Sequence, residues 1–289
     1  MRPVSRGWPA PAKLNLCLHV TGRRPDGYHE LQTAFQLIDL ADEIDFELRH
    51  DGVIERPAGE ASVAPDEDLV VRAARRLREA AGRPELGVSI SVAKALPAGG
   101  GLGGGSSDAA TTLVALNRLW RLDLPVARLL ALGTTLGADV PLFIAGRSAW
   151  GEGIGEQLTP VDWPAASFAI VFPGQGSGTR DVFQAPELTR NSPKVTIGSF
   201  LASLASGETP RNDLEPVVRA RHAGVREALE WLGRRGAARL TGSGACVFAT
   251  YADRAAAMSA LRGLPEGWTG FVANGINRSP LLERSIADG

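Results

Sequence analysis

The residues best suited to chemistry lie in one glycine-rich run from Leu96 to Asp108, called here the glycine loop. It contains two glycine triplets around Leu102, followed by Ser106 and Ser107. Glycine permits positive φ angles and close approach of the backbone to a ligand. Serine and aspartate are typical N-cap residues, so a helix is expected to begin at 106–108. A glycine loop leading into a helix presents free N–H groups and the positive end of the helix dipole, which together bind phosphate.

Two predicted elements would hold this loop in place. Alternation over 88–92 predicts a strand that enters the loop, and apolar residues at helical spacing from Ala109 to Trp120 predict the helix that follows. A flexible linker is the alternative, although linkers are usually polar and lack such flanking elements. The loop also matches G-x-G-x-x-G with Asp123 downstream, as in dinucleotide-binding folds, but any glycine-dense run gives this match. A Walker A loop is excluded, because no Lys-Ser or Lys-Thr follows the glycines.

A second candidate group lies on a predicted strand near the N-terminus. Strict alternation from Ala12 to Val20 places Lys13 and Asn15 side by side on one face of that strand. A solvated strand face is the simpler interpretation of the same pattern, and the strand alone favours it.

Further candidates stand at the ends of loops. Tyr28 and His29 end a glycine–proline loop, and Phe183 follows the glycine-rich loop 174–179. Two separate core or rim aromatics are the simpler interpretation of Tyr28 and Phe183. Asp139 precedes Val-Pro, where it suits a helix N-cap as well as a catalytic role. The Gly-Ser-Gly turn within 240–245 is by itself more typical of a hairpin than of a ligand loop.

The remaining pattern predicts an α+β fold with two layers in each half. We expect a division near Pro160, giving segments 1–159 and 160–289. Other elements are predicted from periodicity and from capping residues. The predicted helices are 66–81 or 68–81, 125–136, 197–205, 214–232 and 253–262, and the predicted strands are 31–40, 44–48, 168–172, 246–251 and 270–274.

Composition limits the classes of function. The chain of 289 residues is 44% hydrophobic, with a net charge of −1 and no basic run, so we expect no nucleic-acid partner. No apolar run is long enough to cross a membrane, and the N-terminus lacks the apolar segment of a signal peptide. Cys17 and Cys246, the only cysteines, form neither a disulfide framework nor a zinc set. We therefore expect a cytoplasmic protein, whose oligomeric state the sequence does not indicate.

Several motifs together resemble a known superfamily. Pro97 to Gly103 with Ser106-Ser107 resembles the phosphate loop of the galactokinase–homoserine kinase–mevalonate kinase (GHMP) superfamily. Within it, the kinases of cytidine-diphosphate methylerythritol, which act in the non-mevalonate route to isoprenoid precursors, resemble this chain nearly throughout. The stretches that carry this closer resemblance are Pro11–Leu16, Asp26–His29, Leu136–Pro141 and Leu240–Phe248.

The resemblance implies a fold and a set of roles. The fold would be the two-domain GHMP kinase fold, with an α/β ATP-binding domain over 1–159 and a ferredoxin-like domain over 160–289. Lys13 and Asp139 would be the catalytic pair. The ATP phosphates would contact Pro97, Ala98, Gly99, Gly100, Gly101, Leu102, Gly103, Gly104, Gly105, Ser106 and Ser107. The substrate would contact Asn15, Tyr28, His29, Thr179 and Phe183, with Tyr28 and Phe183 enclosing a cytosine and His29 bonding its edge.

The implied reaction is transfer of the ATP γ-phosphate to the 2-hydroxyl of cytidine-diphosphate methylerythritol, a small-molecule substrate, with Mg²⁺ as cofactor. An aspartate accepts the hydroxyl proton or orients the hydroxyl, and the two roles stay open. The metal ligands are unassigned, with Ser107 a candidate. The resemblance places Asp68, where relatives carry asparagine, and Lys94 near the adenine without fixing their contacts. A homoserine or mevalonate kinase, a non-catalytic nucleotide-binding module and a dehydrogenase are the alternatives.

Overall fold

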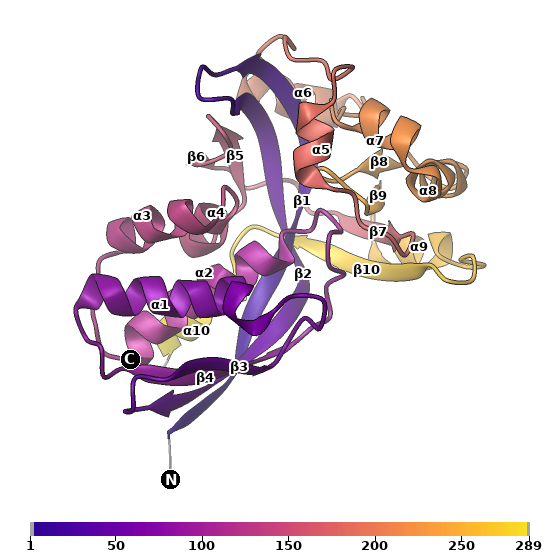
Figure 1. The fold of residues 1–289 in the computed structure, drawn as a ribbon. Helices are drawn as coiled ribbons and strands as arrows, with labels where there is room; N and C mark the ends of the chain where they lie inside the picture. The colour runs from indigo at the N-terminus through magenta and orange to yellow at the C-terminus, as the bar shows by residue number, and fades with distance from the viewer. Residues whose placement is uncertain (1–2, 288–289) are drawn as a thin grey trace.

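Two long antiparallel strands run through most of the height of the molecule (Figure 1). They are β1 (Val4–Arg23) and β2 (His29–Arg49), within a computed structural model that describes residues 3–287. The predicted strand over 12–20 is confirmed as part of β1, and the predicted strands 31–40 and 44–48 form the single strand β2. The pairing register shifts on both sides of Lys13–Asn15, so irregular backbone lies where the candidate residues are.

The strands form one sheet that extends through both halves of the chain. The path is β3 (Ile54–Ala58), β4 (Gly87–Ala93), β2, β10 (Thr269–Ile276), β7 (Ser167–Phe172), β9 (Val247–Tyr251) and β8 (Arg239–Leu240). β1 and β5 (Ala149–Glu152) also pair with β2, and β6 (Gln157–Pro160) pairs with β5. Only the β3–β4 pair is parallel among residues 3–287. β10 connects the two halves, because it pairs with β2 at one end and with β7 along most of its length.

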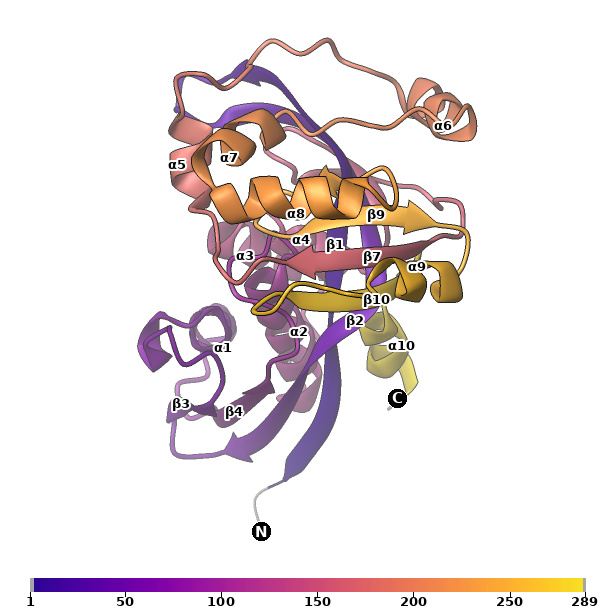
Figure 2. The same cartoon turned by 90° about the vertical axis from the view of Figure 1, so that its right-hand side faces the viewer.

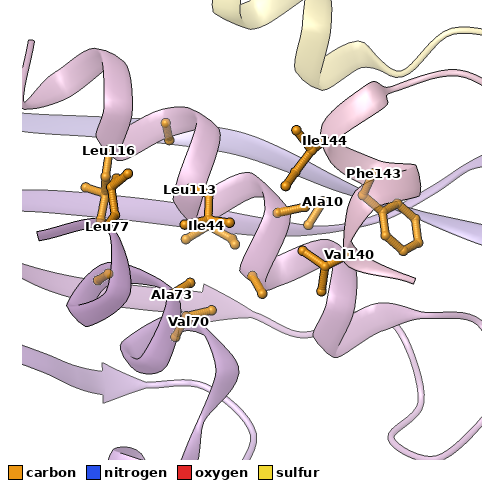
Figure 3. Close-up of a cluster of buried hydrophobic side chains, with 14 of the residues drawn as sticks. Ala10, Ile44, Val70, Ala73, Leu77, Leu113, Leu116, Val140, Phe143 and Ile144 are labelled. Atoms are coloured by element: carbon orange, nitrogen blue, oxygen red, sulfur yellow. The ribbon is translucent and has the colours of Figure 1, made fainter. Parts of the chain in front are cut away.

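Helices cover the sheet in the first half and enclose a hydrophobic core. They are α1 (Leu69–Ala81), α2 (Gly104–Leu119), α3 (Val126–Leu136), α4 (Val140–Ala145) and, from the end of the chain, α10 (Pro280–Ala287), with a 3₁₀ turn at Pro65–Glu67. Figure 3 shows Leu77 of α1, Leu113 of α2 and Ile44 of β2 meeting in this core. Asp68 caps α1 by accepting the Val70 N–H, as one of the two predicted starts requires.

The second half has its own core beneath its helices. They are α5 (Thr179–Gln184), α6 (Ile197–Ala205), α7 (Glu215–Arg221), α8 (Ala223–Gly233) and α9 (Arg254–Ala260). Figure 2 shows α8 and α9 lying against the antiparallel strands β9, β7 and β10. The α+β class predicted from the sequence is confirmed.

A third hydrophobic cluster lies between the two halves. Leu14 and Leu16 of β1 pack there with Phe168 of β7 and Phe248 of β9. Apolar packing therefore continues across the expected boundary, and the division after residue 159 stays a prediction. No helix within residues 3–287 has the length and apolar character to cross a membrane.

Cys17 and Cys246 are both buried in this third cluster, and their burial predicts low reactivity of the two thiols. Burial raises the pKa of Cys17 to about 12 and raises that of Cys246 as well. The thiolate is the reactive form, so it is scarcely populated at pH 8. We expect iodoacetamide to leave both cysteines unmodified in the native protein and to alkylate both in urea, as measured by mass spectrometry. Alkylation of either thiol in the native protein would contradict the packing.

Candidate active site

Lys13 is a buried lysine with a complete set of acceptors. Its residue is 3% exposed, and Nζ donates to Asn15 Oδ1 at 2.6 Å and to the Gly101 carbonyl at 2.8 Å. Nζ also lies 3.5 Å from Asp139 Oδ2. A buried ammonium is tolerated only with such partners. The solvated-face interpretation of this strand is wrong, because the glycine loop covers the face that carries Lys13.

Asn15 holds Lys13 in place. The amide is 3% exposed, accepts from Lys13 through Oδ1, and donates through Nδ2 to Thr33 Oγ1 at 2.8 Å. Thr33 in turn donates to the Cys17 carbonyl at 2.6 Å. This chain of bonds fixes the orientation of the amide, since only its oxygen can accept from an ammonium.

Asp139 brings a carboxylate to this lysine from α4, far away in the sequence. It occupies the N-cap position of α4, as one interpretation of the sequence required, but its side chain makes no capping hydrogen bond. The carboxylate faces Lys13 instead, and 31% of the side chain is exposed. An aspartate at an N-cap that does not cap is available for another task, and its exposure lets a ligand reach it.

The glycine loop wraps closely around Lys13. The Lys13 N–H donates to the Leu102 carbonyl at 3.0 Å. Gly101 and Gly103 both have φ of +76°, in the left-handed region that favours glycine. A Cβ on Gly101 would lie 2.4 Å from the Thr241 carbonyl oxygen, so no side chain fits there.

The glycine loop ends in a helix start with unused N–H groups. Gly103 is the N-cap of α2, without a side chain, and the first helical bond runs from the Ser107 N–H to the Gly103 carbonyl at 2.8 Å. The N–H groups of Gly104, Gly105 and Ser106 donate to no protein acceptor in the described part of the chain. Together with the dipole of a 16-residue helix, these groups suit an anion.

The serines that close the loop do not act as the predicted caps. α2 begins at Gly104 rather than at 106–108, because the backbone of Gly103 already adopts the N-cap position. Ser107 is fully buried and its hydroxyl donates to the Pro11 carbonyl at 2.7 Å, so its candidate role as a metal ligand stays a prediction. Ser106 is partly exposed at the open end of the helix.

A second glycine segment, residues 240–245, packs directly against the glycine loop. The N–H groups of Ala245 and Cys246 donate to the carbonyls of Gly99 and Gly100 at 3.0 and 2.9 Å. Thr241 Oγ1 accepts from the Asn15 N–H at 3.0 Å. The residues alone predict a hairpin for this turn. The only local signal for its position was its Gly-Ser-Gly triplet, which does not indicate a distant partner.

The predicted base-binding residues form a second group around α5. The rings of His29 and Phe183 lie 5.3 Å apart between centroids, tilted by 31°. Tyr28 is 61% exposed and has no ring partner among residues 3–287. Burial and the charges of Arg190 and Arg23 lower the pKa of His29, so the ring is neutral at pH 7. The structure thus brings His29 and Phe183 together and leaves Tyr28 open.

Thr179 links the two groups. It begins α5, and its Oγ1 lies 2.7 Å from Ser243 Oγ in the 240–245 turn. Ser177 lies in the loop just before α5, and its hydroxyl donates to the Ser243 carbonyl. The segment that carries Phe183 is therefore fixed to the turn that supports Lys13 and Asn15.

Two residues that the resemblance places near an adenine have protein partners. Asp68 caps α1 and lies 2.9 Å from the Arg56 guanidinium. Lys94 donates to Asp42 and Asp108, and burial raises the pKa of Asp108 above its usual range. Within the described residues, no group of three or more His, Cys, Asp or Glu side chains could hold a metal ion.

Comparison with known proteins identifies the family of the chain. Residues 68–147 match the model of the GHMP kinases N terminal domain, and residues 196–270 match the GHMP kinases C terminal model. A 4-diphosphocytidyl-2-C-methyl-D-erythritol kinase from Alkalilimnicola ehrlichii is 54% identical over 97% of this chain and 94% of the relative. The kinase of the same name from Halorhodospira halophila is 56% identical over 95% of this chain and 94% of the relative.

Solved structures extend the comparison. A crystal structure of 4-(cytidine 5'-diphospho)-2C-methyl-D-erythritol kinase superposes with a TM-score of 0.80 at 35% identity, covering 94% of this chain and 99% of the other. A homoserine kinase from Cytophaga hutchinsonii gives a TM-score of 0.70 at 18% identity and shows the shared fold alone, over 96% of each chain. Family models, sequence relatives and structure therefore converge, and the chain belongs to the 4-diphosphocytidyl-2-C-methyl-D-erythritol kinase family of the GHMP kinases.

Proposed function

We propose that this phosphotransferase transfers the γ-phosphate of ATP to the 2-hydroxyl of 4-diphosphocytidyl-2-C-methyl-D-erythritol, in the non-mevalonate supply of isoprenoid precursors. The observation that carries this proposal is the 3.5 Å approach of Lys13 Nζ and Asp139 Oδ2 beside the uncapped start of α2. A base, a cation and a phosphate cradle then lie within one site. We place the ATP-binding domain in residues 1–159, the C-terminal domain in 160–289, and the protein in the cytoplasm.

The glycine loop would hold the phosphates of ATP. The free N–H groups of Gly104, Gly105 and Ser106 point out of the first turn of α2, where the helix dipole adds positive potential. The left-handed glycines keep side chains out of the path of the phosphate chain. Phosphoryl transfer depends on positioning and charge neutralisation more than on covalent chemistry, and a rigid backbone cradle supplies the positioning.

Asp139 and Lys13 would act on the accepting hydroxyl. The exposed carboxylate of Asp139 can accept the hydroxyl proton or orient the hydroxyl toward phosphorus. Lys13 brings a positive charge to the same point, where negative charge moves between oxygens during transfer. Asn15 and the Gly101 carbonyl fix the ammonium, so it needs no reorganisation as the reaction proceeds.

Mg²⁺ fits this site as an ion held mainly by the nucleotide. The described residues offer no all-protein cage, and Ser107 is engaged with Pro11. Mg²⁺ characteristically binds through phosphates, waters and one or two carboxylates, so such a cage is not required. When bound, the ion would neutralise phosphate charge.

The proposal is tested by measuring ADP release from ATP with a panel of acceptors. The purified protein should turn over the cytidylylated methylerythritol and not homoserine or mevalonate. Turnover of either of the latter in its place would assign the chain to another GHMP activity. ATP binding without turnover of any acceptor would indicate a nucleotide-binding module, and binding of a nicotinamide cofactor a dehydrogenase.

Phe183→Ala should weaken binding of the cytidylylated acceptor. Stacking of a base on an aromatic ring is worth about 1–3 kcal/mol, so the acceptor KM should rise about 5- to 150-fold. The ATP KM should stay near that of the wild type, because Phe183 is in α5 rather than in the glycine loop. Steady-state kinetics with each substrate varied in turn measures both. An unchanged acceptor KM would leave Phe183 as a packing residue.

A further inference from the structure

Arg190 forms a bridge between the two residues of the aromatic pair. Its Nε donates to His29 Nε2 at 3.0 Å. Its Nη2 donates to the Phe183 and Ala185 carbonyls at 3.1 and 2.7 Å, and its Nη1 donates to the Leu188 carbonyl at 3.0 Å. One planar guanidinium thus ties the imidazole at the start of β2 to the end of α5. The motifs of the sequence did not single out this arginine.

The bond from Arg190 determines which nitrogen of His29 carries hydrogen. A guanidinium can only donate, so Nε2 must accept. In a neutral imidazole the other nitrogen then bears the proton, and the lowered pKa of His29 keeps the ring neutral. Nδ1 has no hydrogen-bond partner in the described part of the chain. It is also not one of the fully buried polar atoms that lack a partner there. The free edge of His29 is therefore an N–H donor.

The same guanidinium anchors the backbone of Phe183, whose ring lies against His29. Phe183 lies in the last turn of α5, whose carbonyls lack helical partners. Arg190 supplies donors and a positive charge there, where the helix dipole favours a cation. The backbone position of Phe183 and the tautomer of His29 therefore both depend on one side chain.

We propose that Arg190 is a positioning residue that sets base specificity, by presenting His29 as an Nδ1–H donor beside the Phe183 ring. This inference rests on the proposed cytidylylated acceptor. N3 of cytosine is an acceptor and meets such a donor, whereas N3 of uracil carries hydrogen and faces it with a second donor. Sites that bond a substrate group reject analogues that leave the site unpaired. Arg190 thereby favours cytosine without touching it.

Arg190→Met tests this directly, because it keeps much of the apolar stem and removes every donor. We compare kcat/KM for the cytidine acceptor with kcat/KM for its uridine analogue. The ratio of the two should fall at least about fivefold, which is the lower end of the cost of leaving one buried donor unpaired. The loss should lie in the acceptor KM, with kcat and the ATP KM near those of the wild type. Arg190→Lys, which keeps one donor and the charge, should restore part of the ratio.

Arg221→Met is the matched control. Arg221 also donates to α5, at the Asp181 carbonyl, and pairs with Glu187, but it does not contact His29. It should leave the cytidine-to-uridine ratio unchanged. If the ratio fell as much in Arg221→Met as in Arg190→Met, the cause would be loosening of α5. That result would overturn the proposed role of Arg190.

The tautomer is measured separately, by two-bond ¹⁵N–¹H correlation spectra of the protein without substrate. The chain has four histidines, and His29→Gln assigns the signal of His29. The wild type should show hydrogen on Nδ1 of His29, and Arg190→Met should lose that preference. Hydrogen on Nε2 in the wild type would overturn the inference whatever the kinetics.

The outcomes separate the two proposals. A wild type that does not turn over the cytidylylated acceptor refutes the proposed function, while the spectra still test the Arg190–His29 bond. A wild type that turns it over, with an unchanged base preference in Arg190→Met, refutes only the inference about Arg190.

Discussion

Asp139→Asn should lower turnover about 10²- to 10⁴-fold, the usual cost of losing a positioned base, with little change in ATP affinity. Asparagine keeps the size of the side chain and cannot take up the hydroxyl proton. The carboxylate is the group that lies 3.5 Å from Lys13 Nζ. The substitution should not weaken the start of α4, because this N-cap side chain makes no capping bond. Turnover is measured by ADP release and ATP affinity by calorimetry.

Asp253→Asn is the matched control for this change. Asp253 is also an N-cap aspartate, but it caps α9 by accepting the Ala256 N–H at 2.8 Å. The substitution there should leave turnover unchanged, since asparagine caps helices about as well as aspartate. Near-normal turnover in Asp139→Asn would reduce Asp139 to an ordinary helix-start residue and remove the main support for the proposed chemistry.

Gly103→Val should lower kcat/KM for ATP at least about 10²-fold, the cost of displacing reacting groups by about 1 Å. The backbone has φ of +76°, where an L side chain costs about 1–2 kcal/mol. A Cβ there would lie 2.8 Å from Phe143 Cζ and 3.2 Å from Lys13 Cε. Phe143 is buried in the core, so the loop and Lys13 must move. Far-ultraviolet circular dichroism checks that the fold survives.

Gly82→Val separates backbone strain from damage to the site. Gly82 ends α1 with φ of +64°, and nothing lies within 4 Å of a Cβ built there. It should lose stability through the same kind of strain while ATP kinetics stay normal. Equal losses of kcat/KM in both variants would mean that strain alone explains the effect, and the assignment of the glycine loop to phosphate would fail.

Local signals predicted those elements whose ends are marked by single residues. Asp68 and Gly82 bound α1, as capping chemistry requires. Gly137 follows the end of α3 as predicted, although its backbone is extended rather than left-handed. α5 was not predicted, because six residues after a glycine-rich loop show no helical period. The predicted helix over 214–232 is two helices, α7 and α8, which meet at His222. Periodicity continues across such a break, since both helices bury an apolar face on the same core.

The sequence predicts individual residues of the site but not how these residues lie relative to one another. Lys13 is buried because the glycine loop lies over β1. The alternation of residues along a strand does not predict such a contact with a distant segment. The 240–245 turn supports that loop through hydrogen bonds between backbone groups, which carry no side-chain signature. Arg190 lies outside every motif because its role is to hold other residues. Resemblance to relatives supplied the pairing of Lys13 with Asp139, and the roles of both stay predictions.

The position of β10 in the sheet has a consequence for biosynthesis. This strand lies near the end of the chain, yet it fills the gap between β2 and β7. During translation both neighbours leave the ribosome first, so one edge of β7 and the edge of β2 at residues 37–38 stay unpaired until residues 269–276 emerge. Such edges pair readily with other chains. We therefore expect the second half of synthesis to be the stage at which a growing polypeptide is most prone to aggregate, until β10 joins the sheet.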